Sequence, residues 1–454
     1  MTLGRNTELK FLNNFYSKAE NDIVVLYGKK GEDLQIVLRQ FLKNKDYFYY
    51  SARQCSDLEQ LYLFYNEMCD NKDLFHKDIT YTDIFRSMLA KKVQKRVIVI
   101  NEFQNIVKGT PDFLEEMVHI CHDKWNAQSV LFVLVSSSVS YIEKQMVEKI
   151  GDLAYEISSI QKVKELPFLE LVRQFNKYKL GDCVETYAII GGHPSFWKYW
   201  DGTLSVKENI CKYVLTKGSY LYECGVHALP DEFREPAVYN TILLTLAEGK
   251  QKLNDIFKHT GFNRAKISVY LKNLIEMELV EKIDSYETAG KENAQKGIYR
   301  INDQFVHFWY RYVYANLSKL EIMDANAFYD SYIEPTFREY VSEYFTRVCT
   351  EYLMLMNQMK QLPFKCINWG MWVGKVGTID IVAQDEAGKT LVGLCNWEHD
   401  EMSYDDFEWL NFCAKQAKLE VKNYYLFSFG KFDQKLKLKA STMKNIVLID
   451  STQL

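Results

Sequence analysis

Two glycines and two lysines that follow the first apolar run of the chain are candidates for binding a phosphate group. The run spans residues 22–27, and Gly28, Lys29, Lys30 and Gly31 come directly after it, ahead of a helical pattern. The N-terminus of a helix carries partial positive charge and unpaired backbone N–H groups, so it attracts anions. These four residues are therefore the cofactor-binding candidates of the sequence.

Three basic residues on a short helix are candidates for contacting nucleic acid. Helical patterns cover residues 234–247, 251–259 and 263–277, and the turn between the last two has the composition of a helix-turn-helix connection. The apolar residues of the third helix recur at helical spacing and are expected to face the core: Ile267, Tyr270, Leu271 and Leu274. Arg264, Lys266 and Lys272 are then exposed, as on a recognition helix that contacts phosphates and bases. Alternatively, these helices belong to a winged helix, a helix-turn-helix unit followed by a two-stranded wing, that contacts only protein.

A second basic stretch lies near the end of the chain. Residues 411–444 contain eight lysines against Glu420 and Asp433. Lys435, Lys437 and Lys439 alternate with leucines, as on one face of a strand or an amphipathic edge. This pattern predicts either a surface that contacts phosphates or lysines that protect a sheet edge from pairing.

The elements that must position these residues indicate an α/β, multidomain chain. Apolar runs alternate with helices over residues 1–165, which is typical of a doubly wound parallel sheet; the runs are 22–27, 47–50, 96–100 and 129–135. Residues 166–232 are predicted to form a helical lid, and residues 233–332 a winged-helix domain, with strands at 280–284 and 297–301, plus connecting helices. Residues 333–454 are predicted to form a small α/β domain with strands at 364–373, 377–384, 390–397, 423–428 and 445–449.

Composition excludes several classes of protein. With 47% hydrophobic and 26% charged residues among 454, the chain is globular and not disordered. The net charge of −4 means that any surface for nucleic acid is local. Ten cysteines without a CxxC pair argue against zinc ribbons and disulfide scaffolds and fit a reducing compartment. No apolar run approaches the ~18 residues of a membrane span, so we expect a cytoplasmic protein.

The order of landmarks resembles the archaeal-type AAA ATPases found in archaea and many anaerobic bacteria. In the N-terminal part the resemblance is carried by Gly4-Arg5, Glu8-Leu9, Gly28, Ile100-Asn-Glu-Phe-Gln104 and Ser136-Ser137-Ser138. Further on it is carried by Ile190-Gly-Gly-His-Pro194, Leu221-Tyr-Glu223, Leu246-Ala-Glu-Gly249, Tyr299-Arg-Ile-Asn-Asp303 and Phe308-Trp-Tyr-Arg311. Residues 377–383 and 393–397 resemble the PD-(D/E)xK nuclease-like (restriction-endonuclease-like) domain fused to these ATPases. The resemblance implies a P-loop ATP-binding core, a winged helix and a nuclease-like C-terminal domain.

The phosphate-binding loop of such ATPases, Gly-x4-Gly-Lys-Ser/Thr, is not met here. Aligned on the following helix, Gly28 is the first glycine, and Asp33, Leu34 and Gln35 stand at the second glycine, the lysine and the hydroxyl residue. A carboxylate repels phosphate, and leucine supplies no charge. The alternative alignment on Gly31 places two acidic residues at the lysine and threonine positions.

The second ATPase motif, a strand ending in Asp-Glu, is also altered. The strand ends in Asn101-Glu102, so an amide replaces the magnesium-binding carboxylate while the water-polarising one stays. The family's arginine near the end of the ATPase core is missing too, because no arginine occurs between residues 96 and 173. We expect no ATP hydrolysis and no ATP or magnesium cofactor.

The nuclease-like motif keeps a single carboxylate. Where the family has an Asp and then (Asp/Glu)-x-Lys on the next strand, this chain has Asp380 and then Leu394-Cys395-Asn396. One carboxylate cannot assemble a two-carboxylate magnesium site. We therefore expect no bound metal and no DNA cleavage.

The sequence thus predicts a pseudoenzyme with Glu102 and Asp380 as catalytic remnants. Its remaining task is binding, either to double-stranded DNA or to a protein partner, through the winged helix and the nuclease-like domain. Two alternatives stay open: an ATP-binding protein whose non-standard loop uses Lys29 and Lys30, and a protein-interaction scaffold that binds no nucleic acid. The oligomeric state is open as well.

Overall fold

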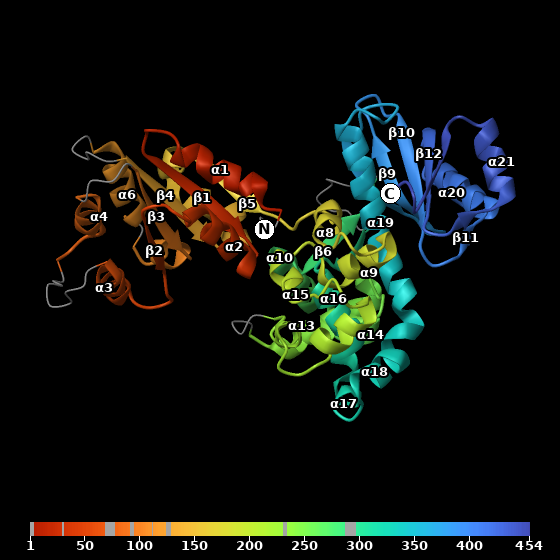
Figure 1. Cartoon of the computed structure of the whole chain (residues 1–454), viewed down its shortest axis with the longest axis horizontal. Helices are drawn as coiled ribbons and strands as arrows, with labels where there is room; N and C mark the ends of the chain where they lie inside the picture. The colour runs from red at the N-terminus through yellow and green to blue at the C-terminus, as the bar shows by residue number, and fades with distance from the viewer. Residues whose placement is uncertain are drawn as a thin grey trace. The chain divides into compact units, whose positions relative to one another are not determined.

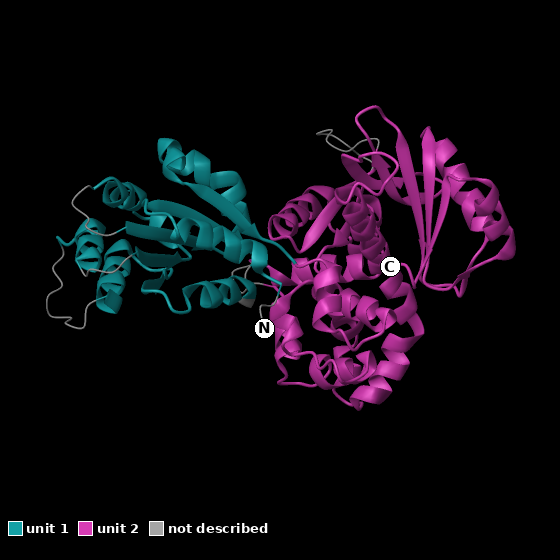
Figure 2. Cartoon of the chain, turned by 45° about the horizontal axis from the view of Figure 1, so that its top comes forward, with its two compact units in different colours: residues 1–165 teal, residues 166–454 magenta. Residues whose placement is uncertain are grey.

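The computed structural model of the chain describes residues 4–29, 31–68, 78–90, 95–110, 112–123, 129–229, 234–286 and 297–454. The chain divides into two compact units, residues 1–165 and residues 166–454 (Figure 2). Lys30, one of the phosphate-binding candidates, lies outside the described residues.

The first unit is built on a five-stranded parallel sheet in the order β2-β3-β4-β1-β5. Its strands are β1 (Asp22–Gly28), β2 (Tyr47–Ser51), β3 (Lys95–Asn101), β4 (Ser129–Ser136) and β5 (Ser159–Val163). Every residue of β1 is buried, as the continuous apolar run predicts for a strand covered on both faces. The edge strand β5 is not predicted from the sequence, because Ser-Ile-Gln-Lys-Val is neither an apolar run nor a regular alternation.

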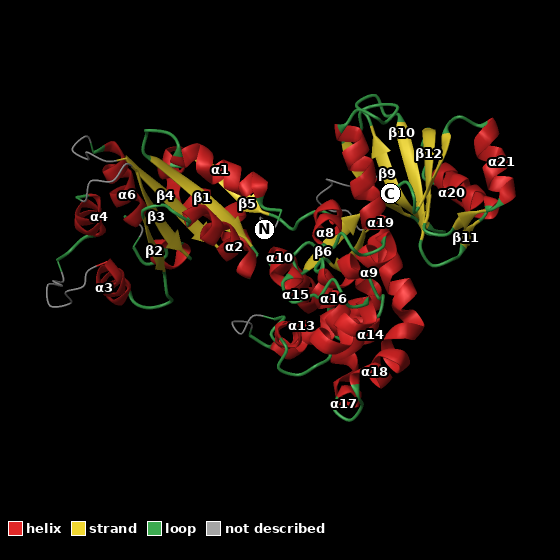
Figure 3. Cartoon of the chain, viewed as in Figure 1, coloured by secondary structure: helices red, strands yellow, loops and turns green. Residues whose placement is uncertain are grey.

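Helices cover both faces of this sheet (Figures 1 and 3). α1 (Asn6–Tyr16) and α2 (Glu32–Leu42) pack on one face, and α3 (Asp57–Met68), α4 (Tyr81–Leu89) and α6 (Phe113–His122) on the other. The four-residue helix α5 (Gln104–Val107) follows β3. Because parallel strands end at one edge, β1 and β3 bring the loop after Gly28 and the pair Asn101-Glu102 to the same side of the sheet.

The second unit begins with helices, as predicted for residues 166–232. They are α8 (Phe168–Gln174), α9 (Leu180–Ile190), α10 (Pro194–Trp197), α11 (Val206–Asn209) and α12 (Tyr220–Val226). Later in the chain follow α16 (Gln304–Phe308), α17 (Leu317–Leu320), α18 (Ala325–Phe328) and the 25-residue α19 (Glu334–Gln358). The buried hydroxyl of Tyr340 on α19 donates to the backbone oxygens of Ala188 (2.8 Å) and Gln304 (3.0 Å), which joins α19 to α9 and α16.

The winged helix has the predicted elements, and no element boundary differs from its predicted position by more than two residues. They are α13 (Pro236–Ala247), α14 (Leu253–Thr260), α15 (Arg264–Glu276), β6 (Val280–Asp284) and β7 (Gly297–Ile301). α14 ends at Gly261, whose φ of 70° suits glycine, and the side chain of Asn263 caps α15 by accepting from the N–H of Lys266 at 2.8 Å.

The C-terminal domain has a five-stranded mixed sheet in the order β14-β12-β10-β9-β8. Its strands are β8 (Asn368–Val373), β9 (Thr378–Gln384), β10 (Thr390–Asn396), β12 (Val421–Ser428) and β14 (Ile446–Asp450), with the short pair β11 (Glu401–Met402) and β13 (Lys431–Phe432). β8, β9 and β10 are antiparallel, whereas β10, β12 and β14 are parallel and are linked by α20 (Tyr404–Gln416) and α21 (Gln434–Thr442). The winged helix contacts edge strand β8, because Ser285 Oγ accepts from the N–H of Val373 at 3.1 Å.

The prediction that Lys435, Lys437 and Lys439 share one face of a strand or edge is wrong. These lysines lie on helix α21, which begins where Asp433 accepts from the N–H of Leu436. At 100° per residue, Lys435 and Lys439 project on one side and Lys437 on another. The alternation of lysine and leucine therefore does not mark a strand here, because the helix buries Leu436 and leaves Leu438 exposed.

Two further expectations can be compared with the structure. The cysteines of the described residues are unpaired, and five of them are buried: Cys183, Cys211, Cys349, Cys366 and Cys413. Among the described helices, none combines the length and the apolar character that crossing a membrane requires.

Candidate functional site

Lys29 in the loop after β1 and Asp33 in the first turn of α2 are each paired within the first unit. Asp33 stands where the alignment expects the second glycine, and its carboxylate lies 3.3 Å from the guanidinium of Arg5. Arg5 is 1% exposed and also pairs with Glu8 at 3.1 Å and donates to the backbone oxygen of Lys164. A phosphate placed here would meet the carboxylate of Asp33, whose charge already has a buried partner.

The lysine of the same loop is paired as well. The ammonium of Lys29 donates to a carboxylate oxygen of Glu165 at 2.8 Å, and both side chains are largely buried. An incoming phosphate would have to displace Glu165 before it could use the charge of Lys29. The charges of Lys29 and Asp33 are therefore both balanced within the first unit.

The side chains at the two positions expected to bind a magnesium ion are neutral amides that form hydrogen bonds within the domain. Gln35, at the hydroxyl position, exchanges hydrogen bonds with the hydroxyl of Tyr49 on β2, at 3.2 and 3.3 Å. Asn101 donates its side-chain amide to Ser51 at 2.9 Å. Amide and phenol groups bind magnesium far more weakly than carboxylates do, so this donor set does not fit a magnesium–nucleotide complex.

The carboxylate of Glu102, directly after β3, accepts hydrogen bonds from α5 and from the end of β4. Glu102 has a φ of 54°, and its carboxylate accepts from the side-chain amide of Gln104 at 2.5 Å and from the N–H of Ser137 at 3.5 Å. Both contacts go to Oε2, one of the two oxygens of the carboxylate that the alignment assigns to water activation. Leu34 of α2, at the lysine position, is 3% exposed and packs into the core between the helices α1 and α2 and the sheet.

The winged helix presents an exposed face on α15. Ile267, Leu271 and Leu274 are buried as predicted, whereas Tyr270 is only partly buried, since its ring lies against Tyr239 and its hydroxyl donates to Glu235. The exposed residues recur at one-turn spacing along the opposite side: Ala265, Ser268, Val269 and Lys272. Sequence reasoning looked only for cations and missed the small residues, although a serine hydroxyl and a valine methyl can read base edges in a major groove.

The three predicted cations of α15 have different surroundings. Arg264 is exposed, lies 4.9 Å from the ring centre of Phe257 and donates to the neutral side chain of Asn254. Lys266 is partly buried and pairs with Glu235 at 3.5 Å. Lys272 is exposed and has no ion pair within the described part of the chain. The charges of Arg264 and Lys272 are thus uncompensated, and that of Lys266 is shared with a carboxylate.

Asp380, the remaining carboxylate of the nuclease-like motif, lies on a strand next to β10, as predicted, and has a raised pKa. Asp380 on β9 lies beside β10, and its carboxylate accepts from the N–H of Cys395 at 2.9 Å. Burial raises the pKa of Asp380 to about 6, although that hydrogen bond opposes the shift. Its neighbours on β10, Leu394 and Asn396, offer no second carboxylate, so this set does not fit a divalent metal.

Replacing Asp380 by asparagine is expected to make stability less dependent on pH. The folded chain binds the proton of Asp380 more tightly than the unfolded chain, whose carboxyl titrates near 3.8. The stabilising contribution of Asp380 is therefore complete below about pH 3.8 and is lost as the pH rises through about 6. Melting temperatures of Asp380→Asn and the wild type should diverge in favour of the variant between pH 4.5 and 7.5. A constant difference over that range would contradict the assignment.

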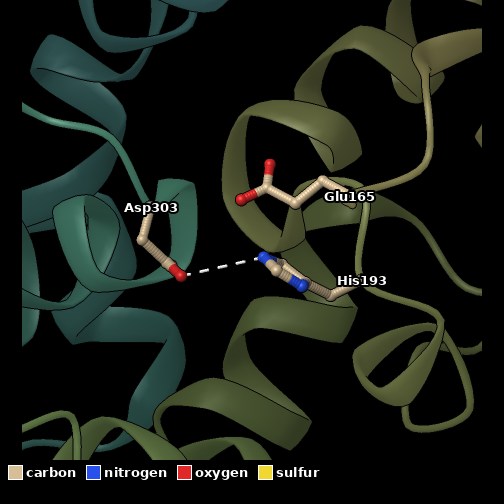
Figure 4. A group of neighbouring side chains, drawn as sticks. All are labelled: Glu165, His193 and Asp303. Atoms are coloured by element: carbon tan, nitrogen blue, oxygen red, sulfur yellow. Dashed lines mark ion pairs between the residues drawn. The ribbon is translucent and has the colours of Figure 1, made fainter. Parts of the chain in front are cut away.

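A buried histidine–carboxylate pair lies elsewhere in the second unit. His193 is the residue directly before α10, after the predicted turn in which Gly191 has a φ of 57°. Its Nε2 lies 3.7 Å from a carboxylate oxygen of Asp303 (Figure 4). Asp303 also caps α16 by accepting from the N–H of Val306. Glu165, drawn in the same figure, belongs to the first unit, where it binds Lys29. The pair joins α10 to α16.

Sequence comparison identifies the parts of the chain. Residues 3–197 match the profile of an ATPase domain predominantly from Archaea. The N-terminal part of this chain is an archaeal-type ATPase domain. Residues 240–282, which include α14 and α15, match the arsR family of bacterial regulatory proteins, and residues 309–408 match a family of archaeal and bacterial proteins of unknown function. The resemblance stated from the landmarks is thereby confirmed for the ATPase domain and the winged helix.

One relative covers most of the chain, and solved structures are similar to parts of it. The uncharacterized protein MJECL04 of Methanocaldococcus jannaschii is 26% identical over 409 residues, which are 88% of each chain. Among solved structures, the Walker-type ATPase PABY2304 of Pyrococcus abyssi has a TM-score of 0.49 at 16% identity, over 68% of this chain and 95% of that one. The ORC2 protein of Aeropyrum pernix has a TM-score of 0.40 at 12% identity, over 70% and 94%.

Proposed function

We propose that this chain binds double-stranded DNA through α15 of its winged helix. We also propose that its archaeal-type ATPase domain does not hydrolyse ATP. The observation that carries the second part is the buried ion pair between Arg5 and Asp33 at the phosphate position. Charge repulsion from Asp33, the Lys29–Glu165 pair and the neutral contacts of Gln35 all oppose binding of a magnesium–nucleotide complex.

The DNA-binding part of the proposal is supported by the face of α15. Small residues occupy its centre, Arg264 stands at its N-terminus and Lys272 two turns later. A recognition helix uses this arrangement to place its N-terminal turns in the major groove while cations at its margins meet phosphates. The arsR-type family match over residues 240–282 points in the same direction.

The C-terminal domain enters the proposal as a nuclease-like domain that does not cleave DNA. Asp380 lacks a second carboxylate beside it, and Lys437 points to a different side of α21 from Lys435 and Lys439. α15 is therefore the better candidate for the main DNA contact. A cytoplasmic location is part of the same proposal.

Magnesium–ATP is expected to leave the melting temperature of the wild type unchanged. If ATP bound with a Kd 100-fold below its concentration, it would stabilise the domain by about 2.7 kcal/mol, which corresponds to roughly 5–10 °C for a unit of this size. The matched variant is Lys29→Ala/Lys30→Ala, which removes both lysines of the loop. A rise in the wild type that this variant lacks would establish nucleotide binding and overturn the proposal.

A further inference from the structure

The outer face of α20 carries two large aromatic side chains that stay about half exposed in the described part of the second unit. Trp409 is 48% exposed and Phe412 is 41% exposed. The opposite face of the helix is buried in the core through Phe407, Leu410 and Cys413. Neighbouring aromatic residues exposed to this degree mark interaction surfaces more often than isolated exposed residues do.

The aromatic pair is held in one arrangement. The two rings stack, with centroids 5.4 Å apart and an angle of 26° between their planes. The indole of Trp409 also lies against Gly377 in the turn between β8 and β9, where an added Cβ would come within 3.0 Å of the ring. Val376 in the same turn is 49% exposed and adds apolar surface. The contacts of the two rings with each other and with the turn restrict their rotamers, which lowers the conformational entropy cost of docking against them.

Charged residues flank the aromatic pair with opposite signs. Glu408 and Lys415 are exposed and lie seven residues apart, which is two turns, so they project from the same flank of α20. Glu408 accepts from the hydroxyl of Tyr404 at 2.7 Å, which leaves its second oxygen available. Lys415 takes part in no ion pair among the residues that the structure describes. The face thus reads acidic, aromatic and basic along the helix.

This order is complementary to itself when the second helix runs in the opposite direction. The midpoint of Trp409 and Phe412 lies within one residue of the midpoint of Glu408 and Lys415. A two-fold axis at that point brings each Trp409 against the partner's Phe412 and each Glu408 against the partner's Lys415. Such a contact is isologous: the same patch serves on both copies, and two ion pairs flank one aromatic core.

We propose that the outer face of α20 is a self-association surface that pairs two copies of this chain in antiparallel orientation. A contact made by one helix and one turn from each copy is small beside the roughly 1,200–2,000 Å² of stable interfaces. Contacts of this size belong to the weak, transient class, so we expect half-association at about 1–100 μM protein. The inference is independent of DNA binding and of the state of the ATPase domain.

Sedimentation velocity of the full chain between 1 and 200 μM tests the surface. The wild type shows a mass that rises from the 53.4 kDa monomer toward twice that value. Glu408→Lys and Lys415→Glu each place like charges opposite one another twice, and each raises the half-association concentration by at least about tenfold. The double variant Glu408→Lys/Lys415→Glu restores the opposite charges and the wild-type association. Lys431→Glu, an exposed charge reversal on β13, leaves association unchanged.

Three outcomes would overturn the proposal. They are a wild type that stays monomeric at 200 μM, single reversals that associate like the wild type, and a double reversal that stays as weak as the single ones. Trp409→Ala/Phe412→Ala is expected to abolish association while circular dichroism matches the wild type. Because the charge variants change only exposed groups, they keep the test decisive even if the aromatic variant misfolds.

Discussion

Substitution of Arg5 by alanine is expected to lower the free energy of unfolding of the ATPase domain by about 3–5 kcal/mol. The guanidinium is buried, pairs with two carboxylates and donates to a backbone oxygen. Removing it leaves Glu8 and Asp33 with buried, uncompensated negative charge, which costs more than the ion pairs themselves contribute. Thermal unfolding should show a midpoint lower by roughly 6–20 °C for a domain of this size.

The matched control is Arg39→Ala, which removes an exposed arginine of α2 and should change stability by less than about 0.5 kcal/mol. A second variant separates charge from packing. Arg5→Met/Glu8→Gln/Asp33→Asn removes the whole charge cluster and should recover most of the loss. If Arg5→Ala melts within 2 °C of the wild type, Arg5 does not hold the loop and our explanation of the altered phosphate site is wrong.

Replacing Arg264, Lys266 and Lys272 together by alanine is expected to weaken duplex binding roughly 100-fold or more at 50 mM salt. Each cation that meets a phosphate releases about one counterion, so the slope of log affinity against log salt should become shallower by about 2–3. Lys266 should contribute least of the three, because Glu235 already shares its charge. Fluorescence anisotropy with a labelled duplex, repeated from 50 to 300 mM salt, measures both quantities.

Glu235→Gln provides a control of opposite sign. It removes the carboxylate that pairs with Lys266 and accepts from Tyr270, so duplex affinity should rise severalfold. Lys435→Ala/Lys437→Ala removes two exposed cations from α21 and should reduce affinity less than twofold. A triple alanine variant of α15 that binds like the wild type would assign DNA binding to another surface.

Local periodicity was sufficient to predict most elements. Buried strands such as β1 and β4 are continuous apolar runs, and α14, Gly261 and α15 follow helix-capping rules that act within a few residues. The failures are also local. The short polar strand β5 has no periodic pattern of its own and forms because it pairs with β1. The alternation of lysine and leucine over 435–439 suggested a strand, but Asp433 caps a helix there.

The sequence was sufficient to predict which catalytic residues the candidate sites lack. It did not predict which contacts the residues at those positions make instead. Sequence alone shows an acidic residue at the phosphate position, but the partner of Asp33 is Arg5, 28 residues earlier in the chain. The pairing of Lys29 with Glu165 spans 136 residues. Such contacts depend on how α1 and β5 pack against β1, which no single-sequence pattern encodes. The same holds for the contact between Glu235 and α15.

The central claim is that duplex binding by this chain is independent of nucleotide. The most direct test is the affinity of the wild type for one duplex at fixed salt, measured without nucleotide and with saturating magnesium–ATP. We predict the same Kd in both conditions, within about twofold, and a steep dependence on salt in each. Binding that requires magnesium–ATP, or a wild type that does not bind duplex DNA at 50 mM salt, would contradict this account.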